Sequence, residues 1–238
     1  MAVGLVVGML TFASSVLAIG TAVNLGTADP FVVLAGSTVT NTGPSVLNGD
    51  LGLSPGSAVT GFPPGSVNGS VHVADALALQ AQNDLTTAYD VAAGQPVDVT
   101  VSADLGGGTL VPGVYKSATG LSLTGTVTLN AGGDPNAVWV FQAGSTLTTA
   151  SNSTVLFVNG AQPCNVFWQV GSSATLGTNT TFAGTILALT SVTLQTGTSV
   201  DGRVLARNGA VTLDTNVITR SVCAAAQPSP TPTLSPTP

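Results

Sequence analysis

The sequence has very few charged side chains for a chain of 238 residues. Charged residues make up 6% of it, against roughly 25% in an average soluble protein. The ten acidic residues are all aspartate, and the four basic residues are Lys116, Arg203, Arg207 and Arg220. Nucleic-acid binding needs several basic contacts to phosphate. This composition, with a net charge of −6, therefore argues against a nucleic-acid partner.

Residues that carry catalytic or metal chemistry are also scarce. The chain has one histidine, His72, and no G-x-S-x-G motif marks a nucleophile. Asp75 lies near enough in sequence to orient His72, but we interpret this histidine as structural. The aspartates are dispersed and several stand beside turn residues, where they bond their own backbone, so they form no pair of the kind that glycosidases require. We predict a protein without enzymatic activity, cofactor, metal ion or small-molecule substrate.

There are only two cysteines, Cys164 and Cys223. In an exported protein, one disulfide between them is expected. It would join the C-terminal coil to an earlier one and close a loop of about 60 residues, which stabilises the fold by roughly 3–4 kcal/mol in the chain-entropy model. The alternative is a pair of buried free thiols.

Long hydrophobic runs are limited to the N-terminus. Residues 1–28 predict a signal peptide, because Leu5 to Ala22 is apolar and Val16-Leu17-Ala18 resembles a cleavage site. The basic start of a signal peptide is missing, so a retained anchor is the alternative. Residues 224–238 are rich in Pro, Thr and Ser and predict a flexible tail that attaches to a cell wall or surface. We expect a secreted or cell-surface domain over residues 29–223.

What the chain does contain is a short repeated phrase. Thr146-Leu147-Thr148-Thr149 is followed by three similar phrases that start at Thr175, Thr193 and Thr212, so the starts are 29, 18 and 19 residues apart. Recurrence at this period indicates a solenoid, in which each unit packs against its neighbours. Because side chains alternate along a strand, Leu147, Leu176, Leu194 and Leu213 should stack inside and the threonines should face outward.

Other patterns complete the predicted fold. Residues 182–188 match residues 200–206 at a spacing of 18, so each coil holds two strands and a turn side, which fits a three-sided β-helix. Residues 31–70 predict two early coils, and residues 95–120 predict an irregular excursion and cap. Apolar residues at helical spacing predict one α-helix over residues 74–93 that packs alongside the solenoid, with Asp75 in its first turn.

The stacked threonines would form a grid with regular spacings. Adjacent coils lie about 4.7–4.9 Å apart, and same-face residues along a strand about 6.5–7 Å apart. Threonine is stiff at χ1, and each hydroxyl both donates and accepts a hydrogen bond. Such a charge-free, preordered surface can hold a regular layer of water, so we expect it to contact a crystalline solid, ice in particular.

Several runs of the sequence support the same idea through a family resemblance. They are residues 36–44, 48–52, 112–115, 138–142, 166–171 and 202–213. On these residues the chain, from about residue 28 to 219, resembles the microbial β-solenoid ice-binding proteins. The resemblance implies a secreted, discontinuous right-handed β-helix with one helix beside it, whose partners are the ice surface and its ordered water.

Members of that family often carry T-(A/G)-x-(T/N) on the ice-binding face. Here residues 149–152 fit the motif, whereas residues 124–127, 178–181, 196–199 and 215–218 depart from it. We expect a monomer whose ice-binding residues come from the repeated phrases and these motifs: Thr124, Thr126, Thr146, Thr148, Thr149, Asn152, Thr175, Thr178, Thr180, Thr193, Thr196, Thr198, Thr212 and Thr215. The alternative is a surface adhesin or structural module that binds a glycan or a protein, since threonine also suits exposed strands in general.

Overall fold

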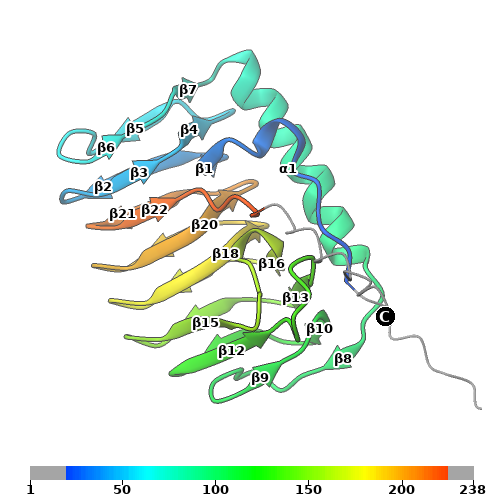
Figure 1. Ribbon diagram of the computed structural model, residues 1–238. Coiled ribbons are helices and arrows are strands. Elements are labelled where there is room, and N and C mark those ends of the chain that lie inside the picture. The colour runs from blue at the N-terminus through cyan, green and yellow to red at the C-terminus, as the bar shows by residue number, and fades with distance from the viewer. Residues whose placement is uncertain (1–19, 225–238) are drawn as a thin grey trace, which may run out of the picture.

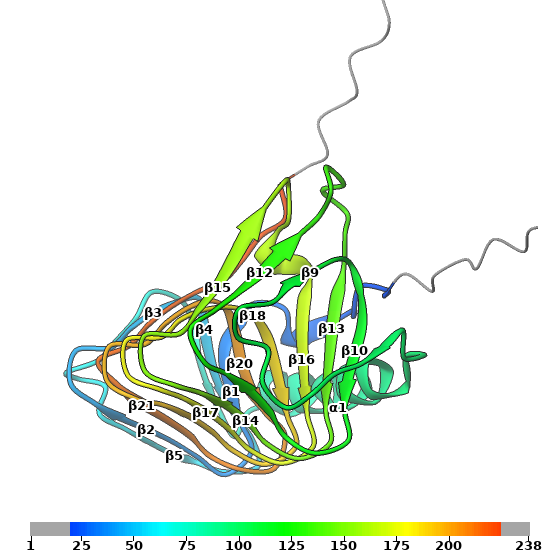
Figure 2. The ribbon, with the colours of Figure 1, turned by 90° about the horizontal axis from the view of Figure 1, so that it is seen from below.

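The computed structural model describes residues 20–224, which form a three-sided stack of parallel β-strands with one long helix beside it (Figure 1). Seen along the stack, the coils have a triangular outline (Figure 2). The predicted β-solenoid with a packed helix is confirmed. Among the described helices, none is both long and apolar enough to span a membrane.

One side of the triangle is a separate sheet, which we call the seven-stranded side. In spatial order it consists of β11 (Leu121–Leu123), β14 (Leu147–Thr149), β17 (Ala174–Leu176), β19 (Val192–Leu194), β21 (Val211–Asp214), β2 (Thr38–Thr42) and β5 (Ala58–Thr60). All its neighbouring strands pair in parallel.

The other two sides share one large sheet. The helix side contains, in spatial order, β8 (Val99–Thr100), β10 (Gly113–Ser117), β13 (Trp139–Ala143), β16 (Val166–Val170), β18 (Thr181–Ala188), β20 (Ser199–Ala206), β1 (Phe31–Ala35), β4 (Asp50–Leu53) and β7 (Val71–Val73). The second open side contains β9 (Thr109–Leu110), β12 (Thr126–Asn130), β15 (Thr154–Val158), the first halves of β18 and β20, β22 (Val217–Thr219), β3 (Val46–Asn48) and β6 (Ser66–Val67). β18 and β20 are long enough to take part in both sides.

The order of the coils in space differs from their order in sequence. β2 pairs with β21, and β3 pairs with β22, so the first coils lie directly on the last one (Figure 1). The chain then crosses the stack once, through helix α1 (Ala76–Gly94). A helix of this length spans about 28 Å, and seven strands at about 4.8 Å spacing span about 29 Å. The helix is therefore long enough to carry the chain from one end of the stack to the other.

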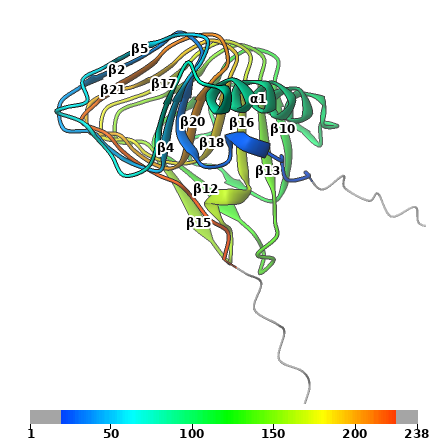
Figure 3. The ribbon, with the colours of Figure 1, turned by 90° about the horizontal axis from the view of Figure 1, so that it is seen from above.

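Helix α1 lies against the helix side through small buried residues (Figure 3). Ala78, Ala81, Leu85, Ala88 and Ala92 follow helical spacing and are fully buried. Across from them lies an apolar layer made of Phe31, Leu34, Val140, Phe167, Leu187 and Leu205. The helix begins after Asp75, which is its N-cap and accepts a hydrogen bond from the backbone N–H of Ala78 at 2.8 Å. The predicted helix over residues 74–93 is thus confirmed within two residues at each end.

The interior of the solenoid is a second apolar cluster. A column of aromatic rings runs along it, from Tyr115 through Phe141 and Trp168 to Phe182, with the central pair of ring centroids 3.9 Å apart. The predicted interior leucines, Leu147, Leu176, Leu194 and Leu213, are at most 1% exposed. Residues 95–120 are more regular than expected, because β8 and β10 continue the helix side and pair with it in register.

Both ends of the described chain pack onto this body. Val23, Leu25 and Ala28 are buried in the layer beneath α1, and a short 3-10 helix, η1 (Gly26–Ala28), contacts α1. Residues 20–28 therefore belong to the folded domain, whereas the predicted cleavage motif at residues 16–18 lies outside the described residues. Cys164, in a second 3-10 helix, η2 (Pro163–Asn165), forms the predicted disulfide with Cys223.

Candidate functional site

One continuous column of hydroxyl side chains crosses the whole seven-stranded side. The strand register places its members directly beside one another on the outer face, so neighbours are separated by one strand spacing of about 4.8 Å. In spatial order the column is Ser122, Thr148, Thr175, Thr193, Thr212, Thr40 and Thr60. Within it, the hydroxyl of Thr40 donates to that of Thr212 at 3.3 Å.

The column stands on a rigid base. In the strands, the residues immediately before and after each member of the column point inward. In six of the seven strands, the residue that precedes the column member is at most 2% exposed. These are Leu121, Leu147, Ala174, Val192, Val211 and Val39. Close-packed interiors hold a backbone in one arrangement, and threonine is restricted at χ1. The outer methyl and hydroxyl groups are therefore preordered.

The outer face is neutral across most of its width. Two residues before the column lie further side chains of the same face, which are small or carry hydroxyls, among them Thr146, Ser173, Ser191 and Thr38. On the other edge of the column, two residues after Thr212, the same face carries a charged side chain, that of Asp214 at the last position of β21. Among the described residues, α1 and both 3-10 helices lie away from this face (Figures 2 and 3).

The repeated phrases do not all share one register. Thr148, and not Thr146, pairs with Thr175. The first phrase is therefore displaced by two residues relative to the other three, and Leu147 stacks on Ala174 instead of Leu176. The predicted interior position of the four leucines is correct, but their arrangement as a single column is wrong for Leu147.

Three of the predicted ice-binding residues are buried, and their assignment is corrected here. Thr149, Thr180 and Thr198 are at most 3% exposed. The Thr149 hydroxyl accepts from the backbone N–H of Gly177 at 2.8 Å and shares a hydrogen bond with the Thr180 hydroxyl at 2.9 Å. The Thr198 hydroxyl donates to the carbonyl of Gly177 at 2.9 Å. Buried turns must satisfy their backbone groups, so these hydroxyls serve the interior of the corner and cannot contact a surface.

A row of predicted residues lies at the corner where the seven-stranded side meets the second open side. Thr196 and Thr215 each donate a hydrogen bond from the hydroxyl to the carboxylate of Asp214. Thr178 donates to the side-chain carbonyl of Gln195 at 3.3 Å. These three hydroxyls already have partners, so the corner row is less available to an external lattice than the central column.

The backbone at this corner turns through the left-handed region. The register aligns Asn152, Asn179, Gly197 and Thr215, all of which have φ between 53° and 73°. Asparagine and glycine adopt this conformation readily, whereas a β-branched residue is strained there. Thr215 is therefore the strained member of the row.

The remaining predicted residues are exposed but are not all on one face. Thr124 and Asn152 are exposed in the corner turns. Thr126 is exposed on β12, on the second open side, where it pairs with Thr154. Ser122, Thr40 and Thr60 were not predicted. For Thr40, the alternation Thr38-Val39-Thr40 was the available signal, but nothing in the repeat spacing indicates that it adjoins Thr212.

The second open side differs in chemistry from the seven-stranded side. It carries the carboxylate of Asp201, whose pKa is raised by burial, and the exposed apolar side chains of Leu156 and Val217. It is also hollowed by a groove of about 340 Å³ lined by Thr181, Ser199, Val217 and Thr219 among others. A charged, hollowed surface is less suited than the seven-stranded side to a flat crystal.

The one histidine belongs to the helix start. His72 Nδ1 lies 2.7 Å from a carboxylate oxygen of Asp75. The backbone N–H of Ala78 and then the contact with His72 lower the pKa of Asp75. Asp75 therefore caps α1 and His72 holds its carboxylate, in agreement with the structural role predicted for His72.

Sequence and structure comparisons place this architecture in a known group. Residues 33–219 match the family described as ice-binding-like. The chain belongs to the ice-binding-like family. An ice-binding protein from Nostoc sp. (strain HG1) is 58% identical over 199 residues, which are 83% of this chain and 74% of that protein.

Solved structures of ice-binding proteins share the fold. An ice-binding protein from an Antarctic biological consortium matches with a TM-score of 0.84 and 48% identity, over 92% of this chain and 97% of that one. An ice-binding protein from an Arctic yeast, solved as the structural basis for antifreeze activity, matches with a TM-score of 0.80 and 33% identity. The match covers 87% of this chain and 98% of that one. The stacked β-fold with one long helix is therefore the fold of this family.

Proposed function

We propose that this member of the ice-binding-like family adsorbs to ice through its seven-stranded side and thereby inhibits ice growth or recrystallisation. The observation that carries the proposal is the uninterrupted column of one serine and six threonines over seven parallel strands. The names of its relatives, which are ice-binding proteins, support the same activity.

The mechanism follows from the order of the face. Each threonine hydroxyl holds water by donating and accepting hydrogen bonds, and the repeated strand spacing places these waters at regular intervals. Because the side chains and backbone are already fixed, little conformational entropy is lost on adsorption. Single contacts are weak, but many of them form together on one rigid scaffold. Ice that advances past an adsorbed molecule must curve around it, so growth slows.

The contact surface that we propose is centred on the column. Its core is Thr148, Thr175, Thr193, Thr212, Thr40 and Thr60 with Ser122, and Thr146 and Thr38 lie beside it on the same face. The corner residues Thr124, Asn152, Thr178, Thr196 and Thr215 form a rim. Thr126 belongs to the second open side and falls outside the proposed surface.

We propose that the protein acts outside the cell, as a monomer. The disulfide between Cys164 and Cys223 suits an oxidising compartment. The Pro/Thr-rich tail and its attachment to a wall or surface lie outside the described residues. The adhesin alternative remains a prediction, and no contact among residues 20–224 specifically favours it.

The decisive variant is Thr193→Tyr, in the middle of the column, with Thr219→Tyr as its control. Thr219 is an exposed threonine on β22, on the second open side. Both proteins should give the circular dichroism spectrum of the wild type. Thermal hysteresis should be lost in Thr193→Tyr, because the ring stands above the plane, and kept in Thr219→Tyr. Loss in the control with retention in Thr193→Tyr would show that the wrong side was chosen.

A further inference from the structure

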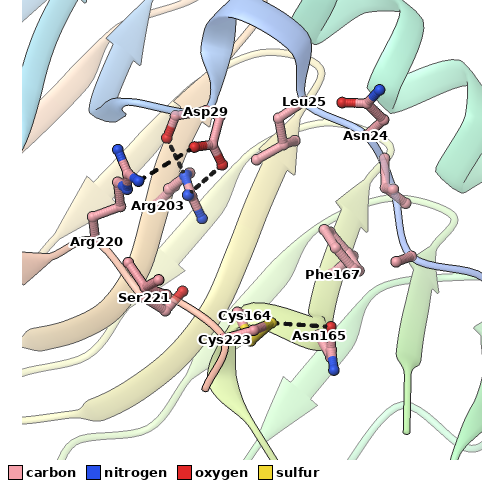
Figure 4. Close-up of a pocket in the computed structure, with 13 residues that line it drawn as sticks. Asn24, Leu25, Asp29, Cys164, Asn165, Phe167, Arg203, Arg220, Ser221 and Cys223 are labelled. Atoms are coloured by element: carbon pink, nitrogen blue, oxygen red, sulfur yellow. Dashed lines mark hydrogen bonds and ion pairs between the residues drawn. A yellow bond between two sulfur atoms is a disulfide. The ribbon is translucent and has the colours of Figure 1, made fainter. Parts of the chain in front are cut away.

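A pocket of about 310 Å³ lies away from the seven-stranded side, where both ends of the described chain meet (Figure 4). It is an open pocket bordered by the segment before β1, by η2 and by the chain that follows β22. The disulfide between Cys164 and Cys223 forms part of its rim. Its lining includes two of the four basic residues in the whole sequence, Arg203 and Arg220.

Arg203 is an unusually placed guanidinium. The residue is 4% exposed, yet it lines the pocket. Its Nε donates to the carbonyl of Asp29 at 2.7 Å, and Nη2 donates to the carboxylate of Asp29 at 2.6 Å. A guanidinium carries five N–H groups, and Nη1 has no hydrogen-bond acceptor among residues 20–224. A buried arginine that lines the pocket thus keeps a donor nitrogen without an acceptor among the described residues.

Arg220 adds a second positive charge next to the first. Its Nη2 lies 3.6 Å from the other carboxylate oxygen of Asp29, and its side chain is 38% exposed. One carboxylate therefore stands between two guanidiniums, which leaves a local excess of one positive charge in a chain whose net charge is −6. Burial lowers the pKa of Arg203, Asp29 opposes this effect, and Arg220 adds to it. An additional anion would relieve the repulsion between the two arginines.

The other walls of the pocket are partly apolar. Leu25 and Phe167 line it as part of the buried core, at 5% and 3% exposed, whereas Ala22 and Val222 line it with exposed apolar side chains, and Val222 is 72% exposed. An inorganic anion would gain nothing from the exposed apolar side chains, whereas the carbon part of an organic acid would remove Ala22 and Val222 from water. A volume of this size is at the lower end of those that hold small molecules.

We propose that this pocket binds a small organic acid. Its carboxylate would accept hydrogen bonds from Nη1 of Arg203 and from Arg220, because guanidinium groups match the forked geometry of carboxylates. Its apolar part would lie against Val222 and Ala22. The site is remote from the column of threonines, so the inference does not depend on ice binding.

The test is an NMR titration of the full ¹⁵N-labelled chain with sodium benzoate at constant ionic strength. Sodium sulfate is the second probe, because it supplies an oxyanion without an apolar part. Benzoate should shift the resonances of Asn165, Arg203 and Ser221 saturably at concentrations up to about 10 mM, a range typical of weak single-site binding. Sulfate should bind more weakly.

Two variants locate the response. Arg220→Gln should weaken benzoate binding about tenfold, as expected when one charge-assisted contact is lost. Arg207→Gln is the matched control, because Arg207 is paired with Asp90 and stacked over the ring of Tyr89, outside the pocket. It should bind as the wild type does.

Three results would overturn the proposal. They are the absence of saturable shifts in the wild-type protein, equal or tighter binding of sulfate, and binding that Arg207→Gln weakens as much as Arg220→Gln does. The wild-type titrations decide the first two even if Arg220→Gln does not fold.

Discussion

Replacing Thr149 by valine should lower the free energy of unfolding by about 2 kcal/mol, although the two side chains have nearly the same shape. Thr149 is 3% exposed, and its hydroxyl is the acceptor for the backbone N–H of Gly177. Valine leaves that buried N–H without a partner, which costs about 1–3 kcal/mol. It also removes the hydrogen bond with Thr180.

The neighbouring residue provides the control. Thr148 belongs to the same strand, but its side chain is exposed on the outer face and forms part of the hydroxyl column. Thr148→Val should therefore change the free energy of unfolding by no more than about 0.5 kcal/mol. In a domain of this size about 1 kcal/mol corresponds to roughly 2–4 °C in Tm. Thr149→Val should consequently melt roughly 4–8 °C below the wild type.

The assay is thermal and urea unfolding of both variants, followed by circular dichroism. Equal losses of stability in Thr148→Val and Thr149→Val would refute the assignment of the two side chains to opposite faces of β14. Thermal hysteresis of Thr149→Val, measured well below its Tm, should equal that of the wild type, because a buried hydroxyl cannot reach ice.

Three further predictions concern stability. Replacing Cys164 and Cys223 together by alanine should cost about 4 kcal/mol in urea unfolding, because the bridge spans 59 residues; a loss below about 1 kcal/mol would contradict this. Thr215→Asn should raise Tm, gaining about 0.5–1 kcal/mol from relief of its strained backbone with φ of 53°, and an unchanged or lower Tm would count against strain there. The backbone N–H of Thr27 and then its hydroxyl lower the pKa of Asp84, so the stability that Asp84 contributes is present above its ordinary pKa of about 3.9 and is lost as the pH falls below it. The difference in Tm between wild type and Asp84→Asn should therefore shrink on acidification, and a constant difference would be the contrary result.

Much of the fold could be predicted from local pattern. The spacing of apolar residues predicted α1. The 18-residue match between residues 182–188 and 200–206 predicted β18 and β20, which pair residue for residue. The helix follows from periodicity within one segment, and β18 and β20 follow from a repeat between coils that are neighbours in sequence.

The register of the first phrase could not be predicted in the same way. Thr146-Leu147-Thr148-Thr149 fits the alternating pattern in two positions that differ by two residues, and both keep Leu147 inside. That coil also contains β15 and η2, and in the structure Thr148 is the residue aligned with Thr175. Threonine at position 149 was ambiguous because its hydroxyl can serve either a surface or a buried turn, and only its contact with Gly177 decides between them.

The position of the first coils was also beyond local pattern. Thr40 and Thr212 are 172 residues apart in sequence, yet their hydroxyls are hydrogen-bonded. Chain order alone would place the first coil at one end of the stack, far from the last. The crossing by α1 reverses that expectation, and it extends the column from five strands to seven.

The proposed function requires that the outward hydroxyl column on seven strands is what contacts ice. The most direct measurement is the fraction of protein captured by a slowly growing ice shell, compared between the wild type and Thr193→Tyr after both are shown to be folded. The wild type should be enriched in the ice, and the variant should be excluded into the liquid. Equal capture of the two proteins would contradict the proposed function.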